Sequence, residues 1–123
     1  MSLIPNGWNI VDTSYGKLAK GDLNNDGFPD IAFTIEENIR DKSPSRKLIV
    51  AFGDKNNYSY TTMIVFDKLI LNKDENGFNG DPLLGVEIKN QSLYIRYCIG
   101  DENKNIITYQ VKYYSDEEWL LIS

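Results

Sequence analysis

Alternation of apolar and polar residues is the main pattern along this chain, and it predicts strands. Within residues 30–36, Ile31, Phe33 and Ile35 fall on one face of a strand, and smaller or polar residues fall on the other. We therefore expect this strand to be half buried against a core. Alternation, β-branched and aromatic content, and flanking turn residues predict further strands at 8–13, 47–52, 58–66, 84–89, 92–99, 106–114 and 119–122.

The segments between these strands favour antiparallel pairing of neighbours. Residues 53–57 form a turn-rich cluster, and Asn90 and Gln91 are spaced as a tight hairpin turn. The connection at residues 37–47 has mixed charge and a proline. About eight strands in an antiparallel meander follow from this spacing.

The meander divides into two blade-like halves, 8–66 and 84–122. A closed propeller needs about 4 to 8 blades, and this chain has material for two. The prediction is an all-β fold in which the two halves pack together as a partial propeller or a sandwich. The 123 residues fit one domain, 1–123, without a second core.

Composition and charge agree with a folded β domain and limit its partners. The sequence is 41% hydrophobic and 12% aromatic, which exceeds what a disordered chain carries. Its net charge of -5 gives a field that repels phosphate backbones, so we expect no nucleic-acid partner. No apolar run approaches the roughly 20 residues of a transmembrane helix.

Candidate chemistry is concentrated in residues 21–30, directly before the strand at 30–36. Asp22, Asn24, Asp26 and Asp30 occupy positions 1, 3, 5 and 9 of a calcium loop. Gly27 stands at position 6, where the backbone of such a loop turns sharply. Oxygen ligands at this spacing predict a metal site.

The remaining positions distinguish this loop from an EF-hand and favour calcium. Position 12, which is a bidentate Glu in EF-hands, is Phe33 here, so an EF-hand is excluded. Three carboxylates, one amide oxygen and the Phe28 carbonyl, with water, would give roughly 6 to 7 oxygens, which suits calcium better than magnesium. The alternative is an empty polar turn, because Asn, Asp and Gly are common in turns without any ion. Their side chains bond to the backbone, or they tolerate positive φ.

Residues 21–32 resemble the calcium-binding signature of FG-GAP repeats, the blades of integrin-type β-propellers. Phe52-Gly53, after the apolar residues 48–51, is similar to the strand that carries the Phe-Gly of that repeat. The resemblance implies calcium held by the loop.

Nearly the whole chain also resembles a family of small uncharacterised bacterial proteins. These proteins pair the same loop with a Gly-Asp-Pro segment, which is residues 80–82 here. This resemblance implies an exported protein of the cell envelope or periplasm, although the sequence shows no signal peptide, and the cytoplasm remains an alternative. Many relatives have cysteines and a glycine pair where residues 72–77 read Asn-Lys-Asp-Glu-Asn-Gly, so no cysteine role is carried over.

Two further features have both a functional and a structural interpretation. Asp74, Asn76 and Asp81 could converge on a second ion, but their spacing is irregular and a plain turn is the simpler reading. The tyrosines could line a binding face, or their alternation could simply coat two faces of a sheet.

Enzyme chemistry has little support in the sequence. The chain has no His to act as a general base near neutral pH, and it has no phosphate-binding loop, nucleophile elbow or zinc-ligand set. We therefore expect no catalytic residues and a calcium-stabilised binding or adhesion module whose ligand is a protein or a glycan. The alternatives are a small extracellular hydrolase that uses carboxylates and an inhibitor-type interaction protein.

Overall fold

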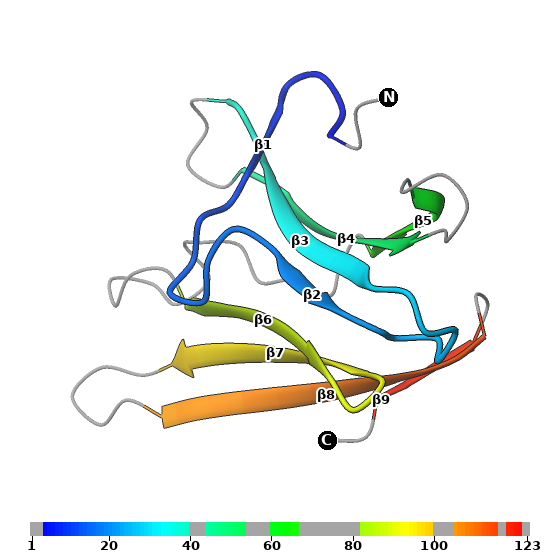
Figure 1. Ribbon diagram of the computed structural model, residues 1–123. Helices are drawn as coiled ribbons and strands as arrows, with labels where there is room; N and C mark the ends of the chain where they lie inside the picture. Colours follow the sequence, from blue (N-terminus) through cyan, green and yellow to red (C-terminus); the bar gives the residue numbers. More distant parts are fainter. Residues whose placement is uncertain are drawn as a thin grey trace.

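The computed structural model describes residues 4–39, 44–53, 60–66, 82–99, 105–115 and 118–121. These residues form nine antiparallel strands and no helix, arranged as two sheets (Figure 1). The strands are β1 (Trp8–Ile10), β2 (Ala19–Gly21), β3 (Asp30–Glu37), β4 (Arg46–Gly53), β5 (Tyr60–Phe66), β6 (Leu83–Lys89), β7 (Ser92–Ile99), β8 (Asn105–Ser115) and β9 (Glu118–Leu121). The predicted all-β, sandwich-like class is confirmed. The described part holds no helix with the length and hydropathy that crossing a membrane requires.

The first sheet has the order β1-β3-β4-β5, and β2 also pairs with β3. Both β1 and β2 are antiparallel to β3 and pair with different parts of it. Ile10 pairs with Ile35 near its end, and Gly21 pairs with Asp30 at its start. The sequence did not predict β2, because it has three residues and only Ala19 is buried, which leaves no alternation to detect.

The second sheet is a simple meander in the order β6-β7-β8-β9. At its first turn, Lys89 pairs with Ser92, and Asn90 and Gln91 have φ values of 51° and 58°. Two central residues with positive φ define a type I′ turn, whose twist matches that of the flanking strands. The predicted tight turn at these two residues is confirmed.

The main hydrophobic core lies between the two sheets, which explains why the halves pack together. The first sheet and its loop contribute Ala19, Leu23, Ala32, Leu48, Val50 and Phe52, and the second contributes Leu83, Val86, Ile88, Leu93, Ile95, Tyr97 and Val111. Phe66, Tyr113 and Trp119 extend this core as an aromatic cluster, with the Phe52 and Tyr113 rings 5.3 Å apart. Burial of this apolar surface is the main force that joins the sheets.

The prediction that β3 is buried on only one face is wrong. Ile31, Phe33 and Ile35 do lie on a buried face, but it belongs to a second, smaller cluster on the outer side of the first sheet. The opposite face, with Ala32 at 0% and Thr34 at 2% exposure, is buried as well because it faces the second sheet. Small residues on this face allow close approach, which an alternation pattern does not reveal.

The described tyrosines of the second sheet are divided between its two faces, as the structural interpretation predicts, and Tyr15 and Tyr60 lie outside that sheet. Tyr97 is 2% exposed and lies in the core, with Tyr113 packed against it. On β8, Tyr114 follows Tyr113 and is 52% exposed. Tyr94 lies under the Arg96 guanidinium carbon, 5.5 Å from its ring centroid. The tyrosines therefore do not form one continuous binding face.

Candidate metal centre

The predicted calcium loop connects β2 to β3 and is closed at its base by strand pairing. Gly21 and Asp30 are cross-strand partners, so residues 22–29 form the loop of a hairpin on the edge of β3. Asn25 and Gly27 have φ values of 58° and 86°. Asn tolerates this left-handed region, and glycine enters it without steric cost. The sharp turn predicted at Gly27 is confirmed.

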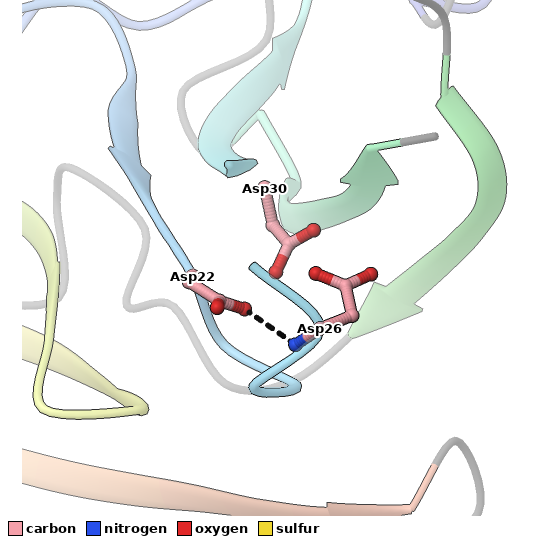
Figure 2. A group of neighbouring side chains, drawn as sticks. All are labelled: Asp22, Asp26 and Asp30. Carbon is pink, nitrogen blue, oxygen red and sulfur yellow. Dashed lines mark hydrogen bonds between the residues drawn. The ribbon is translucent and has the colours of Figure 1, made fainter. Parts of the chain in front are cut away.

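Three acidic side chains converge inside this loop. Each of Asp22, Asp26 and Asp30 offers a carboxylate oxygen, and these oxygens lie within 4.8 Å of one another. Figure 2 shows the three side chains directed toward a common space, Asp22 and Asp26 from the loop and Asp30 from the start of β3. The group could hold a metal ion, since hard divalent cations take carboxylate oxygens as ligands.

The two more exposed carboxylates also hold the loop backbone in shape. Asp22 accepts a hydrogen bond at Oδ2 from the Gly27 N–H (2.8 Å) and a longer one at Oδ1 from the Asp26 N–H (3.3 Å). Asp26 in turn accepts one at Oδ1 from the Phe28 N–H (2.9 Å). An ionised carboxylate has about four acceptor sites, so these bonds leave capacity for a cation.

Asp30 is the buried member of the group, with 0% exposure. Its Oδ2 accepts a hydrogen bond from the Leu23 N–H (2.7 Å), and its Oδ1 accepts one from the Gly53 N–H (2.9 Å). Burial raises the pKa of the Asp30 carboxyl. The two backbone hydrogen bonds oppose that rise, and the negative charges of Asp26 and Asp22 add to it. A cation would favour the ionised form at this position.

Asn24, the predicted neutral ligand, lies beside the carboxylates. One terminal atom of its amide is 3.0 Å from Oδ1 of Asp26 and 3.2 Å from Oδ1 of Asp22. If this atom is nitrogen, it donates hydrogen bonds to both carboxylates. If it is oxygen, four side chains present oxygens to one space, and a cation is needed to offset their repulsion. The loop thus brings all four predicted side-chain ligands together.

The other positions considered in the sequence are not among the converging side chains. Phe28 lies half-buried in the loop, and a ligand role for its carbonyl stays a prediction. Phe33 lies in β3 at 3% exposure, where it packs in the outer hydrophobic cluster, so position 12 supplies no ligand. Asp74, Asn76 and Asp81, the candidates for a second ion, lie outside the described residues.

Sequence reasoning did not identify two structural residues of the site. Leu23 is 1% exposed and belongs to the core between the sheets, although it stands between two predicted ligands. Gly53 donates to Asp30, and a side-chain carbon built on it would overlap the carbonyl oxygen of Pro29. The Phe-Gly pair at 52–53 could have indicated the role of Gly53, because it places a glycine at the end of β4, beside the loop.

Replacing Gly53 with Ala should destabilise the fold by about 1–3 kcal/mol, the usual cost of overpacking. The obstacle is the Pro29 backbone, which cannot rotate away as a flexible side chain would. Urea denaturation measures the loss. Lys20→Ala, at an exposed position of β2, is the control and should stay within about 0.5 kcal/mol of wild type. Equal stability of the two variants would contradict the close contact.

Comparison of the chain with protein families, curated proteins and solved structures gives no match. The loop geometry and the packing around it are therefore the grounds for assigning a function.

Proposed function

We propose that the loop binds calcium through Asp22, Asn24, Asp26 and Asp30, with the Phe28 carbonyl as a further ligand, and that the ion stabilises the fold. The observation that carries this proposal is the convergence of three carboxylates within 4.8 Å, one of them fully buried. A polar turn needs single side-chain to backbone bonds and gains nothing from bringing three negative charges together. A set of several protein oxygens, three of them carboxylates, suits calcium better than magnesium, which usually keeps several of its waters.

A structural role for the ion fits the surroundings of the loop better than a catalytic one. The Asp30 carboxylate joins two chain segments, since it accepts N–H groups from the loop and from the end of β4. The Asp22 and Asp26 carboxylates are held by N–H groups of their own loop. These groups are positioned to hold the backbone and an ion.

The wider function that we propose is a calcium-stabilised, non-catalytic binding or adhesion module of the bacterial cell envelope. Its support is the resemblance of residues 21–32 and of Phe52-Gly53 to FG-GAP repeats. The contact of Gly53 with the loop gives this pair of motifs a shared physical role. The ligand would be a protein or a glycan, and the chain's charge of -5 disfavours nucleic acid.

Arrays of immobilised glycans and envelope proteins, probed in calcium and in chelator, test this function. We expect at least one ligand to retain the protein in calcium and to lose it in chelator, because the ion stabilises the folded binding surface. Mass analysis of the retained ligand should show it intact. Release of cleaved product would contradict the non-catalytic assignment and would favour the hydrolase alternative.

A further inference from the structure

The calcium loop is connected to the second sheet by a side-chain hydrogen bond. The Gln91 Nε2 donates to the Asn25 Oδ1 at 2.9 Å. Gln91 lies at the turn between β6 and β7, and Asn25 stands between the predicted ligands Asn24 and Asp26. A residue of one sheet therefore holds the segment of the other that carries two predicted ligands.

The backbone conformation at both residues fixes the direction in which their side chains point. Asn25 and Gln91 both have φ of 58°, which lies in the left-handed region. Beside the contact, Gly21 and Ile88 are so close that a side-chain carbon on Gly21 would lie 2.7 Å from the Ile88 Cγ2. The base of the loop thus packs on β6 while its outer part bonds to the β6–β7 turn.

We propose that Gln91 is a positioning residue of the calcium loop, which makes the second sheet part of the ion site. By fixing Asn25, Gln91 favours the loop conformation in which Asn24 and Asp26 face the ion. This inference rests on the proposed calcium function. If the Gln91–Asn25 contact strengthens calcium binding by some factor, thermodynamic linkage requires that bound calcium strengthen the contact by the same factor. Calcium binding and docking of the β6–β7 hairpin would then be coupled.

The coupling is expected to be modest, because both residues are exposed and the hydrogen bond competes with water. A net contribution in the lower half of the usual range of one such bond corresponds to roughly two- to five-fold in calcium affinity. A change of this size is measurable by isothermal titration calorimetry.

The experiment compares Gln91→Met with Gln110→Met. Both remove a glutamine amide and keep the length of the side chain, but the Gln110 Nε2 donates to the Ser92 Oγ inside the second sheet and not to the loop. We expect calcium to bind Gln91→Met about two- to five-fold more weakly than wild type, and Gln110→Met as tightly as wild type. In the Asn25→Gly background, which suits the positive φ and removes the acceptor, Gln91→Met should have no further effect.

The outcomes separate this inference from the proposed function. If wild type takes up no calcium, the proposed function fails and Gln91 loses its role with it. If wild type binds calcium and Gln91→Met binds it equally well, only the role of Gln91 is overturned. A loss of affinity that persists in the Asn25→Gly background would also overturn it, because the effect would not pass through Asn25. Urea unfolding in chelator shows whether a variant is merely less stable.

Discussion

Calcium at a hundred-fold excess over its dissociation constant should stabilise the wild-type protein by about 2.7 kcal/mol. For a chain of 123 residues, that gain corresponds to a rise in melting temperature of roughly 8–16 °C. The expected dissociation constant is roughly 0.1–1 mM, in the range of extracellular calcium modules. Melting curves in calcium and in chelator, together with calorimetric titration, measure both quantities.

The physical reason is the charge that folding concentrates in the loop. Asp22, Asp26 and Asp30 bring their carboxylates together, and burial of Asp30 removes water that would otherwise solvate its charge. Without a cation, this arrangement opposes folding. An ion that binds only the folded loop offsets the cost and adds its binding free energy to stability.

Asp26→Ala removes a central ligand and should abolish the calcium dependence of melting. Asp12→Ala is the matched control, because it removes an exposed aspartate outside the loop and should leave that dependence unchanged. Magnesium should stabilise the wild type less than calcium does. Coincident wild-type melting curves in calcium and in chelator, with no metal found by elemental analysis, would show that the loop is only a polar turn.

Leu23→Ala should destabilise the protein by about 2–5 kcal/mol, the range for removing a fully buried leucine side chain. Leu23 is a loop residue by sequence, yet it is 1% exposed and packs in the core shared by both sheets. Its loss leaves a cavity at the position where the loop joins the two layers. Urea denaturation in chelator measures this cost independently of the ion.

Leu18→Ala is the matched control for Leu23, since Leu18 precedes β2 and is 46% exposed. Its substitution should change the free energy of unfolding by no more than about 0.5 kcal/mol. If the two variants are equally stable, Leu23 does not contribute to the core. A deficit confined to Leu23→Ala would establish the loop as a structural part of the sandwich.

Features that depend on local spacing could be predicted from the sequence. Alternation, residue content and turn residues located eight of the nine described strands, and a tight turn was predicted at Asn90 and Gln91, where the structure has a type I′ turn. The separation of the halves at 8–66 and 84–122 matches the two sheets. The spacing of Asp22, Asn24, Asp26 and Asp30 correctly predicted that their side chains converge, because all four lie within nine residues of one another and the backbone turns at Gly27.

Features that depend on contacts between distant segments were decided by the tertiary structure alone. Alternation cannot show that both faces of a strand will be covered, so Ala32 became a core residue only when the second sheet packed on it. The same holds for Leu23, which no local pattern distinguishes from a solvent-exposed loop residue.

The contacts between the loop and the rest of the fold also depend on the tertiary structure. Gly53 contacts Pro29, and Gln91 contacts Asn25, although the two residues of each pair are far apart in the sequence. Such contacts follow from strand order and sheet packing. The periodicity of apolar residues indicates only local secondary structure, so it cannot predict them. The sequence by itself determined which side chains converge in the candidate site. Strand pairing within the first sheet and packing of the second sheet on it decided which groups contact the loop, because these come from β4 and from the β6–β7 turn.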